Sequence, residues 1–238
     1  MLKKLLRLLA PKFVFRFYHH LLARIAAFAY RNPSEKMIVV GVTGTNGKST
    51  TVQFIGRILE DAGFRVGWTS TAGFKVARKE WVNDQKMTML GRFQTQKMLK
   101  RMLKAKCSHV IVETSSQGIL QSRHIGINYD VAVLTNLTPE HIEAHGGFEA
   151  YKKAKQVLFK KTKHSKRKKF NKEIIEKTAV VNITDEHAED FLSIGLDRSY
   201  GFGLEGEVKG GKNVRPMSVV PVLASDVEFD STGTQFSI

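Results

Sequence analysis

The 238-residue sequence has little of several features that define other classes of protein. It contains one cysteine, Cys107, so no disulfide can form within the chain, and its composition gives no sign of an oxidising compartment. It has only five prolines, and 42% of its residues are apolar while 25% are charged. This is the composition of an ordinary globular protein that can bury a core.

The first 36 residues lack the long apolar run that a signal peptide or a membrane span requires. A signal peptide needs roughly 7–15 uninterrupted apolar residues, and a spanning helix needs about 20. Arg16, Arg24 and the two histidines between them interrupt every candidate. We therefore predict that residues 1–36 form a basic amphipathic helix, or two helices divided at Pro11. Such a segment can lie on an anionic membrane or pack on a protein domain.

Acidic residues are scarce relative to basic ones, with 22 Asp and Glu against 38 Lys and Arg, a formal net charge of +16. Residues 1–34 contain no acid, and a second basic cluster, KKTKHSKRKK, spans residues 160–169. Both clusters lie outside the predicted core. They suit phosphate-bearing partners or an anionic membrane, although a solvated basic surface is the alternative. No aromatic stacking motif is interleaved with them, so we expect no nucleic-acid partner.

The sequence does have a regular alternation of strand-like and helix-like segments. The expected strands lie in KMIVVGVTG, FRVGWTST, SHVIVETSS, YDVAVLTNLT and TAVVNITDE, with helices between them. This order predicts an α/β fold with a mostly parallel sheet flanked by helices. From about residue 199 the pattern changes to short strands and a hairpin, so the C-terminal portion is predicted to be β-rich.

The helix expected after the first strand has apolar residues at helical spacing. Val52, Phe54, Ile55, Ile58 and Leu59 are predicted to form one buried face, and Gly63 to end the helix.

Three of the expected strands end in unusual polar sequences, TGTNGKST, ETSSQG and TNLTPEHIEAHG. In open α/β sheets, ligands bind beyond the carboxyl ends of the strands. We therefore predict that these three loops gather into one site.

The first of these loops lies within GVTGTNGKSTT, residues 41–51, and has the ending of a phosphate-binding loop. Glycines let the backbone N–H groups face phosphate oxygens, and the following helix adds its positive N-terminal dipole. Lys48 is expected to reach the β- and γ-phosphates, and Ser49 or Thr50 to offer a hydroxyl to Mg²⁺. Val42, however, stands where the usual pattern has glycine.

The other two loops carry further candidate residues. Glu113, at the end of HVIVE, suits an acceptor for Mg²⁺ or its water shell, although it could simply cap the next turn. His141 and Lys155, fourteen residues later, have no role that their residue types alone decide, because Mg²⁺ prefers oxygen ligands.

Taken together, TGTNGKSTT, the stretch from VETSSQGILQSR to TNLTPEHIEAHG, and YKKAKQVLF resemble the central ATPase domain of the Mur ligases. The resemblance covers roughly residues 38–185. It is strongest to the branch that adds the third residue to UDP-N-acetylmuramoyl-L-alanyl-D-glutamate. The phosphate loop of these ligases has the form T-G-T-N-G-K-[ST], which accounts for Val42.

The resemblance implies a role for each matching residue. Ser49 and Glu113 would bind one Mg²⁺, Glu113 and His141 a second, and Lys155 would be carbamylated by CO₂ to supply a carboxylate-like metal ligand. The residues implied to hold the ATP phosphates are Gly44, Thr45, Asn46, Gly47, Lys48, Ser49 and Thr50. Those implied to contact the UDP-muramoyl-peptide substrate are Thr88, Ser115, Gln121 and Arg123.

The sequence departs from the family pattern in several places. TML, residues 88–90, replaces the usual Thr-Thr-Pro, Glu140 replaces an aspartate, and residues 160–172 look like an insertion. We expect a basic helical segment at 1–36 and, at 37–238, a truncated ATP-binding central domain. The family's domains for the uridine nucleotide and for the incoming amino acid have no counterpart here.

The resemblance therefore implies a cytoplasmic ATP-dependent amide ligase of peptidoglycan precursor synthesis, with the basic helix able to lie on the inner face of the membrane. Its substrates would be a UDP-muramoyl-peptide and an amino acid. Two alternatives stay open. One is a related ligase of the folylpolyglutamate or cyanophycin type, and the other is a regulatory or membrane-associated module that binds ATP without ligating.

Overall fold

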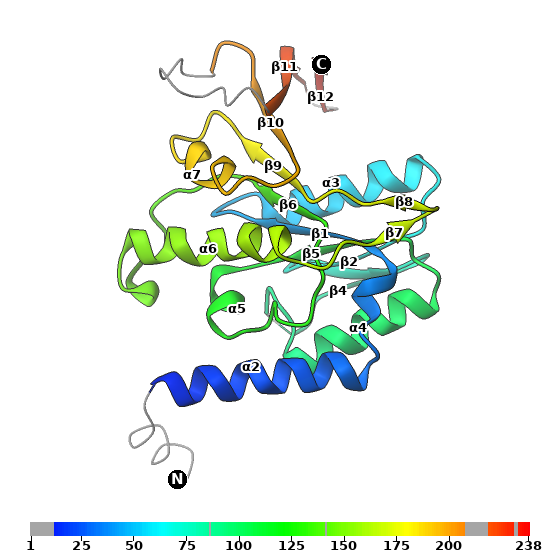
Figure 1. Cartoon of the computed structure of the whole chain (residues 1–238). Coiled ribbons are helices and arrows are strands. Elements are labelled where there is room, and N and C mark those ends of the chain that lie inside the picture. The colour runs from blue at the N-terminus through cyan, green and yellow to red at the C-terminus, as the bar shows by residue number, and fades with distance from the viewer. Residues whose placement is uncertain (1–11, 86, 141, 208–218, 231–232) are drawn as a thin grey trace.

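A computed structural model of the chain describes residues 12–85, 87–140, 142–207, 219–230 and 233–238. In this part of the chain a single large sheet runs through the molecule, with strands in the order β12-β11-β10-β9-β6-β1-β5-β2-β3-β4 (Figure 1). Its strands are β1 (Ile38–Thr43), β2 (Val66–Thr69), β3 (Gly73–Val76), β4 (Lys79–Val82), β5 (His109–Glu113), β6 (Val131–Leu134), β9 (Thr178–Asn182), β10 (Arg198–Leu204), β11 (Val219–Phe229) and β12 (Thr234–Ser237).

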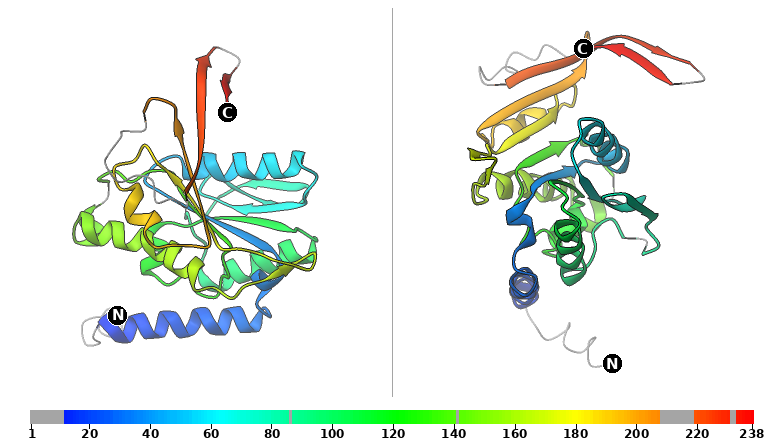
Figure 2. Two further views of the ribbon diagram at one scale, coloured as in Figure 1. Left: turned by 45° about the horizontal axis from the view of Figure 1, so that its top comes forward. Right: turned by 90° about the vertical axis from the view of Figure 1, so that its right-hand side faces the viewer.

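The central strands of this sheet are parallel, as the alternation of strands and helices predicts. Strands β2, β5, β1, β6, β9, β10 and β11 pair in parallel, whereas β3, β4 and β12 join antiparallel at the two ends. The expected C-terminal hairpin is β11–β12, and Figure 2 shows it extending beyond the helical layers. The prediction of a mostly parallel sheet with a β-rich C-terminal portion is confirmed.

Helices cover both faces of the sheet. The helices of the described residues are α2 (Lys12–Ala29), α3 (Lys48–Asp61), α4 (Arg92–Lys104), α5 (Ser116–Leu120), α6 (Phe148–Lys163) and α7 (Ala188–Leu192), with 3₁₀ turns η1 (Pro33–Lys36) and η2 (Ile142–His145). All but α2, which packs on the outside of α4, belong to these two layers. Strand β1 alternates between the two layers: Val40 and Val42 belong to the cluster under α3, while Val39 belongs to the larger cluster on the opposite face. Such continuous burial explains why the central strands are apolar runs.

The buried face of α3 differs from the predicted one. Val52 and Gly56 are buried, and a Cβ on Gly56 would lie 2.5 Å from the ring of Trp68, so the helix sits close to the sheet. Phe54 and Ile58 are exposed instead of buried. Only part of the apolar set therefore faces the core.

The N-terminal helix α2 lies on the outside of α4, away from the strands (Figure 2). Its inner face carries the buried small residues Ala23, Ala26 and Ala27, and Ala27 lies against Gly126. Small side chains let the two helices approach closely. Pro11, the predicted division between two helices, lies outside the described residues. Within the described part of the chain, no helix is both long and apolar enough to cross a membrane.

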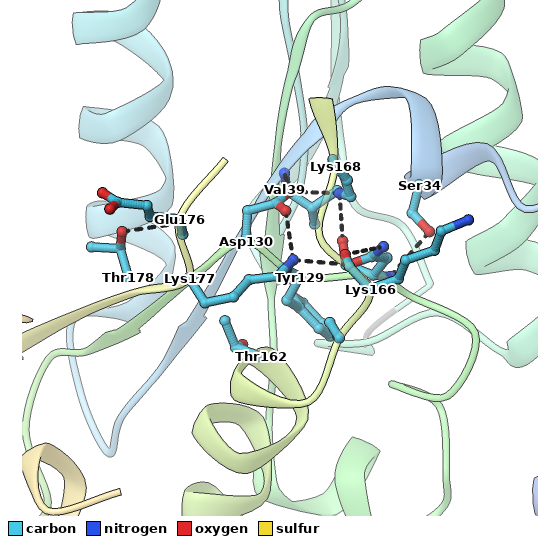
Figure 3. Close-up of polar contacts among 12 residues, drawn as sticks. Ser34, Val39, Tyr129, Asp130, Thr162, Lys166, Lys168, Glu176, Lys177 and Thr178 are labelled. Atoms are coloured by element: carbon cyan, nitrogen blue, oxygen red, sulfur yellow. Dashed lines mark hydrogen bonds and ion pairs between the residues drawn. The ribbon is translucent and has the colours of Figure 1, made fainter. Parts of the chain in front are cut away.

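The second basic cluster is not simply a solvated surface. The chain leaves α6 and forms a small hairpin of β7 (Lys169–Phe170) and β8 (Glu173–Ile174), and Lys168 just before it is buried. Lys168 Nζ lies 2.5 Å from Asp130 Oδ2, and Lys177 Nζ lies 2.8 Å from Asp130 Oδ1 (Figure 3).

This buried ion cluster joins the amino ends of two neighbouring strands. Asp130 Oδ2 also accepts a hydrogen bond from the backbone N–H of Val39, 2.9 Å away. Lys168 Nζ donates to the carbonyl oxygens of Met37 and Asn128 as well. Every polar group of the cluster is thus paired, and the cluster fixes the basic segment to the edge of the sheet opposite the phosphate loop.

Candidate nucleotide-binding and catalytic site

The three polar strand ends predicted to converge do so. Strands β6, β1 and β5 are immediate neighbours at the centre of the sheet and all run in the same direction. The loops that follow them therefore emerge side by side at one edge. Direct contacts between the loops, described below, confirm the prediction.

The loop after β1 turns sharply into α3. Gly47, at the N-cap of α3, has φ 75°, a left-handed conformation that favours glycine. At Gly44 a Cβ would lie 1.8 Å from Thr135 Oγ1, so no side chain fits there. The first turn of α3, with exposed Thr50, leaves backbone N–H groups without intrahelical partners, as an anion-binding helix start does.

The loop after β6 holds the phosphate loop in shape. Asn136 Oδ1 accepts hydrogen bonds from the backbone N–H groups of Thr45 and Asn46, at 3.2 and 2.8 Å. Thr135 Oγ1 donates to the carbonyl oxygen of Asn46 at 2.7 Å. These contacts were missed from the sequence, although TNLT had been recognised as a polar strand end.

Lys48 and Ser49 lie at the start of α3, beside the carboxylate of Glu113. Ser49 Oγ donates to Glu113 Oε2 at 2.7 Å, and Glu113 is buried. Lys48 Nζ donates to the carbonyl oxygen of Thr45 at 2.6 Å, which holds the ammonium group over the loop. Burial lowers the pKa of Lys48, and the negative charges of Glu113 and Glu140 partly oppose that shift.

The carboxylate of Glu113 is oriented from a third loop. Thr71, after β2, donates its backbone N–H to Glu113 Oε2 at 2.7 Å and its hydroxyl to Glu113 Oε1 at 3.0 Å. The hydroxyl of Thr71 also lies 3.0 Å from Thr88 Oγ1, which brings that predicted substrate residue next to the site. Thr71 was not predicted, because its sequence, TST, resembles an ordinary turn.

Lys155, on α6, approaches the phosphate loop from the other side. Its side chain is buried, Nζ donates to the carbonyl oxygen of Gly44 at 2.5 Å, and Nζ lies 4.3 Å from the centre of the Tyr151 ring. Burial, followed by the positive charge of Lys48, lowers the pKa of Lys155 to about 7. At pH 7 a substantial share of this lysine, about half, is therefore an uncharged amine.

One predicted metal ligand, His141, lies outside the described residues. Its neighbour Glu140 accepts a hydrogen bond from Asn46 Nδ2 at 3.2 Å, so this loop reaches the phosphate loop. Among the described residues, no three His, Cys, Asp or Glu side chains form a metal-binding group. The oxygens of Ser49 and Glu113 nevertheless form the kind of donor pair that Mg²⁺ prefers.

The remaining predicted substrate residues flank α5, with Ser115 just before it and Gln121 and Arg123 after it. Ser115 caps this short helix, where its hydroxyl accepts the backbone N–H of Gly118. Gln121 ends the helix and is exposed. Arg123 donates to the carbonyl oxygen of Met89, next to Thr88. The structure thus brings Arg123 and Thr88 to one segment, whereas it gives no common contact for Ser115 and Gln121.

These features define a P-loop nucleotide-binding domain: a strand–loop–helix in a parallel sheet, Lys48 over the loop, and the Ser49–Glu113 pair beside it. Comparison with known families makes the assignment more specific. Residues 42–235 match the model of the Mur ligase middle domain, and the chain belongs to this family.

Curated relatives agree with this assignment. A UDP-N-acetylmuramyl-tripeptide synthetase of Roseiflexus sp. is 36% identical over 72% of this chain and 34% of its own length. A UDP-N-acetylmuramoyl-L-alanyl-D-glutamate--2,6-diaminopimelate ligase of Halalkalibacterium halodurans is 30% identical over 98% of this chain and 43% of its own length. The chain therefore spans between a third and a half of these relatives.

A solved structure of a UDP-N-acetylmuramoyl-L-alanyl-D-glutamate--2,6-diaminopimelate ligase shares the fold. It superposes with a TM-score of 0.62 at 24% identity, over 84% of this chain and 36% of that one.

Proposed function

We propose that this chain is the ATP-binding catalytic core of an ATP-dependent amide ligase of peptidoglycan precursor synthesis. The acid substrate would be UDP-N-acetylmuramoyl-L-alanyl-D-glutamate, and an amino acid would supply the amine. The observation that carries the proposal is the grouping of Lys48, Ser49, Glu113 and Lys155 around one phosphate loop. The family assignment and the relatives' names support the choice of substrate.

The reaction would proceed in two steps. An oxygen of the substrate carboxylate attacks the γ-phosphorus of ATP, and the bond from that phosphorus to the β-phosphate oxygen breaks. ADP departs, and the substrate carboxylate has become an acyl phosphate. The amine then attacks the acyl carbon, loses a proton, and expels inorganic phosphate to leave an amide. Two anions must approach each other in the first step, so catalysis is mainly electrostatic.

The residues of this chain would act on that charge. Lys48 would leave the Thr45 carbonyl and contact the β- and γ-phosphates, while the N-terminal amides of α3 hold the phosphate oxygens. Ser49 and Glu113 would hold Mg²⁺, which supplies charge neutralisation at the transferred phosphoryl group. Thr71 would keep the carboxylate of Glu113 turned toward Ser49.

Lys155 is suited to carbamylation. Its lowered pKa leaves about half of the amine uncharged at pH 7, and only an uncharged amine can attack CO₂. The nitrogen of the uncharged amine forms a bond to the carbon of CO₂ and releases one proton, so a neutral group becomes an anion. The neighbouring positive charge of Lys48 would stabilise that anion. The two carbamate oxygens would provide ligands for a second Mg²⁺, which an unmodified lysine cannot provide. His141 is proposed as a further ligand of that ion.

The substrate would lie beyond Glu113, where Thr88 and Arg123 meet at one segment. Arg123 is the natural partner for an anionic group of the muramoyl peptide. Ser115 and Gln121 are proposed to line the same surface from α5.

A phosphate-release assay tests the proposal, with ATP, Mg²⁺, the UDP-muramoyl-dipeptide and an amino acid mixture. We expect release that depends on the dipeptide, trapping of the acyl phosphate by hydroxylamine, and a loss of about 10²–10³ in rate in Lys48→Ala. Lys104→Ala, in the last turn of α4 away from the phosphate loop, is the matched control. ATP binding without dipeptide-dependent release or trapping would instead identify a binding module.

A further inference from the structure

The outer face of α2 carries a continuous stripe of large apolar side chains. Its members recur at helical spacing and all are exposed to solvent: Val14, Phe17, Tyr18, Leu21, Ile25 and Phe28. Phe17 and Phe28 are 69% and 80% exposed. A helix that packs only on its own domain would not need apolar residues on its outer side.

The opposite face of α2 is already occupied. Ala23, Ala26 and Ala27 are buried where α2 packs on α4 and the loop at Gly126. The helix is therefore fixed to the domain by small residues, and its large apolar residues are exposed. Figure 2 shows the helix itself at the outside of the molecule. The stripe is a surface of the folded protein and not an incompletely packed core.

A basic residue borders the stripe. Arg24 is exposed and stands three residues after Leu21 and four before Phe28, so it borders the stripe. Residues 1–34 carry seven basic residues and no acid. Burial, followed by the positive charges of Arg24 and Lys161, lowers the pKa of His20 on the same helix.

From this combination we propose that the outer face of α2 docks the protein on an anionic lipid surface. Apolar side chains would enter the boundary between headgroups and acyl chains, and the basic residues would contact lipid phosphates. A second copy of the chain is a poorer occupant, because it would bring together two segments, residues 1–34 of each copy, that carry basic residues and no acid. The proposal does not depend on the ligase activity.

Co-sedimentation of the full chain with vesicles tests the proposal. We expect binding to vesicles containing about one quarter phosphatidylglycerol but not to pure phosphatidylcholine, and weaker binding at about 500 mM than at about 50 mM NaCl. Phe17→Ser with Phe28→Ser should lower the partition constant by about tenfold or more, because both rings lose their contact with lipid. Arg24→Gln should lower it about fivefold, on anionic vesicles only.

The matched control is Phe54→Ser with Ile58→Ser, which removes two equally exposed apolar side chains from α3. This control should bind vesicles as the parent chain does. Absence of vesicle binding, or equal losses in the control and the α2 variant, would overturn the proposal. A third outcome would also overturn the proposal: the parent chain binds no lipid but forms a dimer in sedimentation equilibrium, and the α2 variant abolishes that dimer. The outer face of α2 would then join two copies of the chain.

Discussion

Replacing Lys155 by methionine should make the protein more stable while abolishing turnover. The lysine is 1% exposed, and its folded pKa of about 7 lies well below its ordinary value of 10.5. Burial is the main cause, and the charge of Lys48 is the second. Methionine fills a similar volume, carries no charge, and therefore avoids the desolvation penalty.

The direction in which the stability of the parent chain changes with pH follows from the number of protons bound by the folded and unfolded states. The unfolded chain keeps the proton on this lysine up to about pH 10.5, whereas the folded chain releases it near pH 7. Between these values the unfolded state binds more protons, so the parent chain gains stability as pH rises. The lowered pKa of Lys155 costs the folded state roughly 4 kcal/mol of stability near pH 7.5 and roughly 2 kcal/mol near pH 9.

The variant recovers only part of this penalty. Lys155 also donates to the Gly44 carbonyl and lies over the Tyr151 ring, and together these contacts offset a few kcal/mol at most. We expect Lys155→Met to be about 1–3 kcal/mol more stable than the parent at pH 7.5, with the difference falling by about 2 kcal/mol at pH 9. Urea denaturation at both pH values measures it.

The assay needs two controls. The first is Lys152→Met, one turn earlier on α6. The hydrogen bond from Lys152 to Asp190 raises the pKa of Lys152, so this variant should lose up to about 1 kcal/mol of folding stability at either pH. CO₂-free buffer keeps the amine unmodified, and added bicarbonate should then stabilise the parent chain but not Lys155→Met. A Lys155→Met chain less stable than the parent at both pH values would refute the reasoning, since the lysine would then be a structural anchor.

Three further predictions follow from the contacts. Asp130→Asn leaves two buried ammonium groups without their carboxylate and should cost about 3–5 kcal/mol in chemical denaturation; a loss below about 1 kcal/mol would contradict the structure. Gly44→Ala places a Cβ on Thr135 Oγ1 and should abolish binding of a fluorescent ATP analogue without unfolding the sheet; unchanged affinity would count against the loop geometry. Thr71→Val keeps the backbone donor to Glu113 but removes the hydroxyl, and should lower kcat about tenfold with little change in the KM for ATP. A change in KM alone would assign the hydroxyl to binding.

The site could be predicted from sequence as far as sheet topology determines it. Parallel strands bring their carboxyl ends to one edge, so TGTNGKST, ETSSQG and TNLTPEH had to meet once the strands were recognised. Gly47, Lys48 and Ser49 follow from the loop pattern, and Glu113 follows from its place at a strand end. The positions of these residues were foreseeable because each lies within two residues of a strand or a helix start.

The rest depends on tertiary packing that no local pattern records. Thr71 acts through a backbone N–H and a hydroxyl, and three-residue polar turns of that kind are common. Phe54 and Ile58 fit the apolar periodicity of α3, yet the sheet covers only the side of the helix that carries Gly56. In the sequence Lys168 is one more lysine of a basic run that could be solvated. Only the structure shows that it is buried against the carboxylate of Asp130, 38 residues earlier.

Lys155 differs from the other buried lysines in its partners. Four lysines in the described part of the chain are buried, and three of them contact carboxylates: Lys75, Lys168 and Lys177. Lys168 and Lys177 each donate to three acceptors, which matches the three N–H groups of an ammonium. Lys155 has no carboxylate within ion-pair distance among the described residues, and it lies at the phosphate loop instead of the opposite edge. The fold fully pairs two buried lysines at one edge of the sheet and leaves Lys155 poorly compensated at the other. Lys155 is therefore retained at a cost in stability, which supports the proposal that the site uses an uncharged amine there.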